Sequence, residues 1–542
     1  MKFNTTFIKE HRAHLIQCIL LFFLFSYIVF LYYWISIRTT PVCDDLGYAK
    51  TELSLEVMIV RFVLWSQRTI LEIPLLGILK APYIYNLLFC ALLYPIFTIL
   101  LAKILRLSIF KSFLTLIPLV AFQNLNENES VGVVTTHFNY LLPLITAMWS
   151  VVILRCNKIG LFKGILLLVL SIFSTSNEML AVAFIVIFPF LYFYDRKHKN
   201  WYIAVIGVSI FHLCLVFISG AGTVRLCVDS NVHFPDFENL SLIYKFYQAT
   251  VATVFYYTTQ LNFYSLFLVF TICYCYFRYQ TNALKNSVLI TVIIGLLLFI
   301  YGFINITHSQ QLYNFTISQA VEITTNKACA LMCVSVIAIS ALLYMLLKLN
   351  CNYQIKIIVL SLLVAAFAIR MTMAFSPTIF FSRTRTFFIS NLLILLASCY
   401  LLIRYEVFNK VQIKVVILIL GFFSLCYQYN FLQKNINLIN LPYHSYAYNF
   451  SKCALKYKKP IKYANEFLVV NKISEINSIL DFITPKNAYT SLKEKEILKN
   501  GNLRLLRIKF SPSTEDTQIL PSLISPNDLD NGYLINKGML GY

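Results

Sequence analysis

Apolar segments long enough to cross a lipid bilayer recur along this chain, and they constrain its fold more than any other feature. The first runs from about residue 15 to residue 37, and similar segments follow as far as residue 430. A helix needs about 20 predominantly apolar residues to cross the hydrocarbon core. Only 13% of the 542 residues are charged, against about 25% in soluble domains. The sequence therefore predicts an all-α polytopic membrane protein of the kind that carries its polar groups at the helix ends.

Basic residues flanking these segments predict their orientation, because Lys and Arg are enriched in cytoplasmic loops. Lys2, Lys9 and Arg12 place the N-terminus in the cytoplasm, and the first helix is too long for a cleaved signal peptide. Ten further single spans are expected at about 82–102, 112–123, 138–154, 202–219, 254–277, 286–304, 328–347, 357–375, 387–403 and 413–430.

The apolar stretch 165–194 is expected to cross twice, since Lys163 precedes it and Arg196 to Lys199 follow it. A turn at Ser174 to Glu178 breaks this stretch and caps the next helix. Glu178 is thereby placed on the outer side. The total is about 13 crossings, with the C-terminus outside.

Two regions are predicted: a transmembrane domain at 1–430, which includes an external loop at 38–81, and an external C-terminal domain at 431–542. Within the loop, 51–73 is expected to form an amphipathic helix in the membrane interface with Glu72 on its polar side. In the tail, Ser491 and Glu494 have capping-box spacing, and 503–510 partly alternates like a strand. A small α/β domain is expected there.

Polar residues with chemical potential gather on the predicted outer side, whereas the cytoplasmic side has short basic turns. They are Asp44, Asp45, Arg68, Glu127, Glu129, His137, Asn139, Glu178, Arg225, Arg383 and Arg385. Sugar transfer from a lipid phosphate needs a carboxylate to take the acceptor's proton and cations to hold the leaving phosphate, a role that suits arginine. The structural alternatives are that Asp44 and Asp45 cap a loop, that Arg383 and Arg385 anchor at headgroups, and that Glu178 opens a helix.

The formal net charge of +21 indicates either topology signals with affinity for anionic lipid or a surface for an anionic substrate. Nucleic acid is not an expected partner, because no basic patch stands on a soluble fold. The 14 cysteines have no zinc-site spacing. Cys43, Cys227 and Cys453 are all expected outside. The sequence leaves open whether two of them form a disulfide.

Several short motifs resemble those of bacterial multi-spanning glycosyltransferases of the GT-C type, in particular the serotype-converting O-antigen glucosyltransferases. They are Asp44-Asp45-x-x-Tyr48, Trp65-Ser66-Gln67-Arg68, His137-Phe138-Asn139-Tyr140-Leu141-Leu142-Pro143, Ser176-Asn177-Glu178 and the later Arg225. The resemblance covers about residues 14–400, and adjacent aspartates replace a separated D-x-D.

This resemblance implies an inverting glycosyltransferase of the bacterial inner membrane, with undecaprenyl-phosphate sugar as donor and lipid-linked or O-antigen polysaccharide of lipopolysaccharide as periplasmic acceptor. Asp44 or Asp45 would be the catalytic base, and Arg68, Glu127, His137, Asn139, Asn177, Glu178, Arg225, Arg383 and Arg385 would bind substrate. No metal or other cofactor is implied.

Two other functions remain open. An O-antigen polymerase or ligase has a large external loop between late helices, and the loops here are modest. A flippase or transporter favours internal repeats and polar groups near the middle of the membrane, whereas here no repeat is seen and the charges gather at one face.

The orientation gives a first testable prediction. A reporter fused after residue 430 is expected to read out on the non-cytoplasmic side, because an odd number of crossings follows a cytoplasmic N-terminus. Alkaline phosphatase activity, which requires export, measures this, and the same reporter fused after Arg404 is the cytoplasmic control. A cytoplasmic readout after residue 430 would break the parity argument.

Overall fold

The structure is a computed structural model, and it describes most of the helical region. The described residues are 5–37, 66–108, 132–194, 198–218, 237–259, 262–279, 327–379, 384–405, single positions or short groups within 45–62, 225–230 and 419–423, and the pairs 468–469 and 505–506.

Thirteen α-helices form the described fold. They are α1 (Thr5–Ile37), α4 (Thr69–Leu79), α5 (Tyr83–Leu105), α7 (Val133–Thr136), α8 (Leu142–Leu154), α9 (Leu161–Thr175), α10 (Glu178–Tyr194), α11 (Lys199–Ile218), α13 (Leu242–Thr259), α14 (Phe263–Tyr279), α17 (Lys327–Lys348), α18 (Tyr353–Met371) and α19 (Phe388–Arg404). Shorter turns are the π-helix η2 (His137–Leu141) and the 3₁₀ helices η4 (Phe237–Asn239), η7 (Thr372–Phe375) and η8 (Thr384–Phe387).

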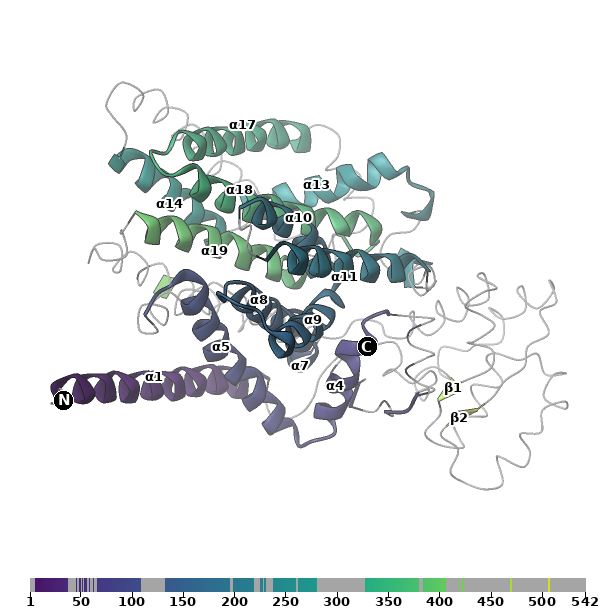
Figure 1. Cartoon of the computed structure of the whole chain (residues 1–542). Helices are drawn as coiled ribbons and strands as arrows, with labels where there is room; N and C mark the ends of the chain where they lie inside the picture. The colour runs from purple at the N-terminus through teal and green to yellow at the C-terminus, as the bar shows by residue number, and fades with distance from the viewer. Residues whose placement is uncertain are drawn as a thin grey trace, which may run out of the picture.

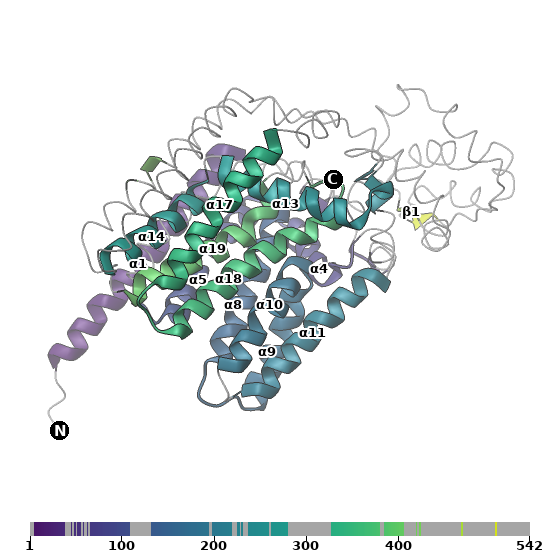
Figure 2. The same cartoon turned by 90° about the horizontal axis from the view of Figure 1, so that it is seen from above.

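The long helices pack side by side in an order that differs from the sequence. Contacts run from α1 to α5, α8, α9, α11, α10, α18, α19, α14 and α17. In Figure 1, α1 lies along the lower edge of the helices and α17 along the upper edge. Figure 2 shows α9, α10 and α11 together on one side of this assembly. The short π-helix η2 contacts α4, α8 and α19, and so joins the first helices to the late ones.

The surface of the described helices is largely apolar, and their apolar core also encloses buried polar side chains. Phe23 on α1, Phe162 on α9 and Phe211 on α11 are exposed, whereas Asn86 and Arg370 are fully buried. Exposed apolar area of this extent marks contact with lipid. Five described helical stretches are long and apolar enough to cross a membrane: 83–105, 133–154, 199–216, 353–375 and 385–404. The chain is therefore a multi-pass α-helical membrane protein, as expected.

The predicted break in 165–194 is confirmed. α9 ends at Thr175 and α10 begins at Glu178. The Asn177 side chain caps α10, with its Oδ1 accepting hydrogen bonds from the backbone N–H groups of Met179 (3.0 Å) and Leu180 (3.3 Å). This cap satisfies two donors that the first turn of a helix would otherwise leave free.

The predicted single span 254–277 is wrong, because two helices, α13 and α14, occupy this region. Asn262 separates them, and its Oδ1 accepts from the backbone N–H groups of Tyr264 and Ser265 at 3.0 Å each. The prediction failed because Asn262, a residue type that favours helix N-termini, stands alone within an otherwise apolar segment. The spans predicted at 112–123 and 286–304, with nearly all of 413–430, lie outside the described residues, and the total of 13 crossings stays a prediction.

Helix ends that the charge pattern assigned to the cytoplasm lie together. The Arg155 guanidinium at the end of α8 donates to the Ile104 carbonyl at the end of α5. His198, before α11, lies with Nε2 2.7 Å from the carbonyl oxygen of Cys156, which follows α8. We call this the basic end of the bundle. The opposite end, where α4, α7 and α10 begin and α9 and α11 end, is called the polar end.

The expectation for 51–73 needs a correction within its described part. The helix α4 begins at Thr69, and Glu72 is buried rather than exposed on a polar face. The Tyr48 hydroxyl donates to Glu72 Oε1 at 3.2 Å, which offsets part of the cost of burying this carboxyl. A carboxyl with an internal partner can face inward at little cost, so Glu72 does not define a solvated face.

In the C-terminal region the described residues form one short antiparallel pair, β1 (Leu468–Val469) with β2 (Leu505–Leu506). The β2 residues fall within the predicted strand 503–510. The capping box at Ser491 lies outside the described residues, and the α/β domain stays a prediction.

Packing between α9 and α11 gives a second testable prediction. A Cβ placed at Gly164 would overlap the Trp201 ring, whereas one at Gly207 would meet nothing within 4 Å. Gly164→Ala is therefore expected to lower the unfolding temperature, because overpacking costs about 1–3 kcal/mol. The matched control Gly207→Ala should be neutral or stabilising by up to about 1 kcal/mol, the helix-propensity gain of alanine. Equal unfolding temperatures for the two variants would contradict the packing.

Candidate functional site at the polar end

The Asp45 carboxylate holds the first turn of α7. Asp45 is fully buried. Its Oδ2 accepts from the Tyr83 hydroxyl (2.8 Å) and the Val134 N–H (3.0 Å), and its Oδ1 accepts from the N–H and hydroxyl of Thr135 at 2.7 Å each. Two of these four donors are orphan N–H groups of a helix N-terminus, where negative charge is favourable. Asp45 therefore fixes where the helical run 133–154 begins.

Gly132 makes this close approach possible. Its φ is +103°, and a Cβ there would overlap the Asp45 carboxylate. Only glycine adopts such a backbone readily and leaves the space open. The segment Gly132-Val133-Val134-Thr135 therefore binds the carboxylate of Asp45, which precedes Gly132 by 87 residues. Local sequence does not reveal this pairing.

Burial raises the pKa of Asp45, and the hydrogen bonds from Thr135, Val134 and Tyr83 counter that rise in part. A carboxylate with four donors has no lone pair directed to solvent, so taking a proton there would weaken this array. The prediction that Asp45 is catalytic stays a prediction; its contacts are those of an anchor for α7.

The π-helix η2 carries His137, Asn139 and Tyr140 from the family-like motif. Single π turns within helices often occur at functional sites. His137 is buried, with Nδ1 2.6 Å from the Val133 carbonyl oxygen and Nε2 3.1 Å from the Tyr94 hydroxyl. Both ring nitrogens are therefore occupied inside the bundle. The Asn139 carbonyl oxygen accepts from Asn177 Nδ2 at 2.5 Å, which ties η2 to the start of α10.

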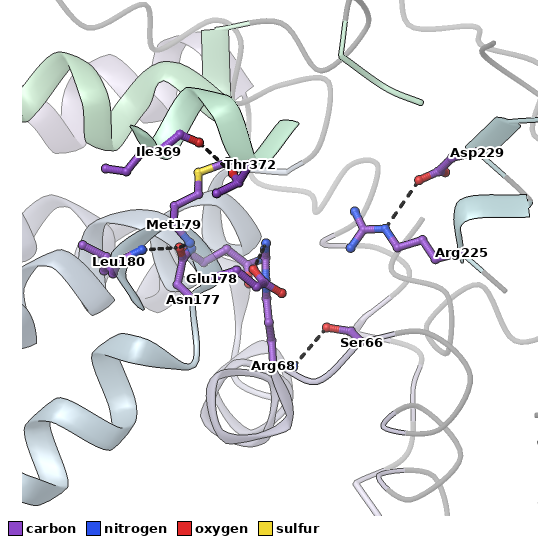
Figure 3. Close-up of polar contacts among 11 residues, drawn as sticks. Ser66, Arg68, Asn177, Glu178, Met179, Leu180, Arg225, Asp229, Ile369 and Thr372 are labelled. Atoms are coloured by element: carbon purple, nitrogen blue, oxygen red, sulfur yellow. Dashed lines mark hydrogen bonds and ion pairs between the residues drawn. The ribbon is translucent and has the colours of Figure 1, made fainter. Parts of the chain in front are cut away.

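Arg68 and Glu178 form an ion pair at the polar end. Arg68 Nη2 and Nε donate to Glu178 Oε2 at 2.6 and 2.9 Å, and the side chains are 15% and 24% exposed. Arg68 is placed by the turn before α4, where its N–H donates to Ser66 Oγ at 3.2 Å. Figure 3 shows the pair beside the Asn177 cap. Two residues 110 positions apart in the sequence thus meet, as the outer-side prediction requires.

Burial by itself would lower the pKa of Arg68, but Glu178 and Tyr140 together outweigh burial and raise it. Arg68 is therefore a permanent cation. Because both donating nitrogens share one Glu178 oxygen, Arg68 Nη1 is not used in this pair.

A second cationic group lies next to this pair. Arg225 Nε is 3.5 Å from Asp229 Oδ2, and its guanidinium faces Arg68 and Glu178 in Figure 3. Burial raises the pKa of Asp229, and the positive charges of Arg225 and Arg385 oppose that rise. Arg225, Arg385 and Arg68 therefore concentrate positive charge at one place, around two carboxylates.

Six of the predicted site residues lie at this polar end: Arg68, Asn139, Asn177, Glu178, Arg225 and Arg385. His137 is buried inside the bundle. Asp44, Glu127, Glu129 and Arg383 lie outside the described residues. Among the side chains that the structure describes, no three of His, Cys, Asp and Glu lie close enough to hold a metal ion.

Sequence reasoning missed two residues in this region, Asp229 and Arg370. Tyr140 lies close enough to Arg68 and Arg370 to interact electrostatically with both. The signal for Arg370 was present, because an arginine inside an apolar segment such as 357–375 is by default a functional candidate.

Comparison of the chain with family models, with curated proteins and with solved structures finds no match.

The Asp45 anchor gives a third prediction. Asp45→Asn is expected to lower the free energy of unfolding by about 2–4 kcal/mol, because an amide nitrogen would then face donors that lose their acceptor. Thr135→Val, which removes a single hydroxyl donor, should cost about 1 kcal/mol. Unfolding in detergent, followed by tryptophan fluorescence, measures both. Equal losses for the two variants would show that the carboxylate does not anchor α7.

Proposed function

We propose that this protein is an inverting glycosyltransferase of the bacterial inner membrane. It moves a sugar, with glucose the first candidate, from a polyprenyl-phosphate donor to a lipid-linked or O-antigen polysaccharide on the periplasmic face. The observation that carries the proposal is the convergence of Arg68, Glu178, Arg225, Asp229 and Arg385 at one end of a bundle whose surface is apolar.

The cations suit the leaving group of this reaction. Cleavage of the bond between sugar and phosphate leaves growing negative charge on phosphate oxygens, and guanidinium groups stabilise such charge most when they are held in place beforehand. Glu178 fixes Arg68, and Asp229 fixes Arg225. Each carboxylate thus orients an arginine, and a guanidinium is suited to donate to phosphate oxygens.

Of the two adjacent aspartates, Asp44 is the better candidate for the base that takes the proton from the acceptor hydroxyl. Asp45 already accepts four hydrogen bonds and is fully buried. In this proposal Asp45 holds the chain and the start of α7, and the residue directly before it does the chemistry. Proton removal by a positioned carboxylate contributes about 10²–10⁴-fold to rate.

A disulfide supports the periplasmic placement of the polar end. Cys227, two residues after Arg225, is disulfide-bonded, and its partner is not among the described side chains. Disulfides persist in oxidising compartments such as the bacterial periplasm and are rare in the cytosol. The polar end is thus expected to face the periplasm and the basic end the cytoplasm, in agreement with the charge rule.

The fourth prediction tests the base. Asp44→Asn is expected to lower the rate of sugar transfer by about 10²–10⁴-fold and to leave the unfolding temperature unchanged. Asp45→Asn should lower both. The measurement is transfer of radiolabelled sugar from a synthetic polyprenyl-phosphate donor by the full chain in lipid nanodiscs. Glu238→Gln, which changes a carboxylate of η4 that belongs to neither ion pair of the cluster, is the control and should keep the wild-type rate.

Three outcomes separate the candidate functions. Transferred label that is lost in Asp44→Asn supports the transferase. Movement of intact labelled lipid across a vesicle bilayer without transfer would indicate a flippase instead, and transfer only from diphosphate donors would indicate a polymerase or ligase. Full activity in both aspartate variants would end the assignment of the base.

A further inference from the structure

Arg370 is a buried cation without a carboxylate partner. It lies on α18 and is 0% exposed. The ion pairs found among the described side chains are Arg68 with Glu178 and Arg225 with Asp229, and neither includes Arg370. Burying a guanidinium is costly unless it is paired and hydrogen-bonded. Such a residue inside a membrane bundle therefore needs an explanation.

Aromatic rings cover one face of the Arg370 guanidinium. Its central carbon lies 3.5 Å from the centroid of the Phe387 ring. Tyr256 stacks on the same ring at 3.6 Å, so it must occupy the opposite face, and Tyr257 meets the ring edge-on at 5.6 Å. Cation–π contact of this kind recovers part of the desolvation cost. It supplies no acceptor for the in-plane N–H donors.

The donors that remain form one edge of the fork. Arg370 Nη1 donates to Thr386 Oγ1 at 2.6 Å, whereas Nε and Nη2 have no hydrogen-bond partner. Nε and Nη2 lie side by side on the guanidinium, and their parallel N–H bonds match two oxygens of a phosphate or carboxylate. An open edge of this shape, held rigid by Phe387 and Thr386, is a binding geometry for an oxyanion.

The surroundings favour a phosphate over a single carboxylate. Tyr140 lies within electrostatic reach of both Arg370 and Arg68, and Arg385 precedes Thr386 in η8. The lipid phosphate that leaves when the sugar–phosphate bond breaks gains charge toward −2, and these arginines would stabilise that charge. The anion must reach a buried position inside an apolar bundle, which suits a phosphate carried on a lipid.

We infer that Arg370 is the residue that binds the phosphate group of a lipid phosphate, through its free Nε–Nη2 edge. The anion site itself follows from the contacts of Arg370. Its assignment to the sugar donor rests on the proposed function. Tyr140, which interacts electrostatically with both Arg68 and Arg370, connects the two cationic groups, and Arg370 is the more deeply buried of the two.

The fifth prediction uses the full chain in phosphatidylcholine nanodiscs and farnesyl phosphate as the probe. Farnesyl phosphate is expected to raise the unfolding temperature of the wild type, because a ligand that binds only the folded state stabilises it. Farnesol, which has the same chain without the charge, should not. Inorganic phosphate is the third probe and tests for a site that binds free phosphate. If inorganic phosphate raises the unfolding temperature and farnesyl phosphate does not, the lipid assignment is overturned.

Two substitutions test the residue. Arg370→Met should abolish the shift with farnesyl phosphate, and it should not lower the unfolding temperature without ligand, because it removes an uncompensated buried charge. Arg370→Lys keeps the charge without the fork and should weaken binding by roughly tenfold to hundredfold. The matched control is Arg404→Met, whose guanidinium lies over the Tyr400 ring at 5.2 Å at the basic end and which should keep the wild-type shift.

The outcomes are distinct. An unchanged shift in Arg370→Met, or wild-type affinity in Arg370→Lys if Arg370→Met does not fold, would overturn the inference. A wild type that responds to no probe would overturn it as well. Loss of binding in Arg370→Met from a protein that transfers no sugar would keep the phosphate site and reject the proposed function. Full transfer activity in Arg370→Met would keep the proposed function and reject the assignment of Arg370 to the sugar donor.

Discussion

The contact of Asp45 with the first turn of α7 is the interaction from which the polar end is built. One buried carboxylate accepts hydrogen bonds from Tyr83, Val134 and Thr135, and so fixes Asp45, α5 and the helical run 133–154 relative to one another. That run carries η2, whose Asn139 carbonyl accepts from Asn177, and Asn177 in turn caps α10 and sets Glu178 toward Arg68. Since lipid offers no hydrogen bonds, each of these polar groups needs a partner within the protein. These successive contacts connect Asp45 to the Arg68–Glu178 ion pair, so the placement of the ion pair depends on Asp45.

The two ends of the bundle differ in what their charges do. At the basic end, Arg155 and His198 contact carbonyl oxygens of neighbouring helix ends, a use that satisfies the last turns of helices. At the polar end, arginines face carboxylates, and Arg370 faces rings and a hydroxyl with two donors free. Charges that serve topology are satisfied within the protein, whereas Arg370 is not. This asymmetry is why the polar end, and not the more basic one, is the place to look for an anionic substrate.

The proposed chemistry divides the work among residues of different kinds. Carboxylates at Glu178 and Asp229 hold arginines in place, Asp45 holds the backbone, and Asp44 remains for proton transfer. A rigid arrangement of this sort favours a transition state with charge on the leaving phosphate, because the dipoles and cations need not reorganise during the reaction. It also accounts for the number of acidic residues found beside a predominantly basic site.

Segment length, flanking charge and local caps were enough to predict the membrane class, the turn between α9 and α10, and the meeting of Arg68, Glu178 and Arg225 at one end. The sequence by itself did not determine that Glu72 and Asp45 would be buried, that Asn262 divides α13 from α14, or that Arg370 would lack a partner. Those outcomes depend on neighbours far along the chain, such as Tyr48, Thr135 and Phe387. The cost of burying a charge is set by the groups around it, and only the tertiary structure brings those groups together.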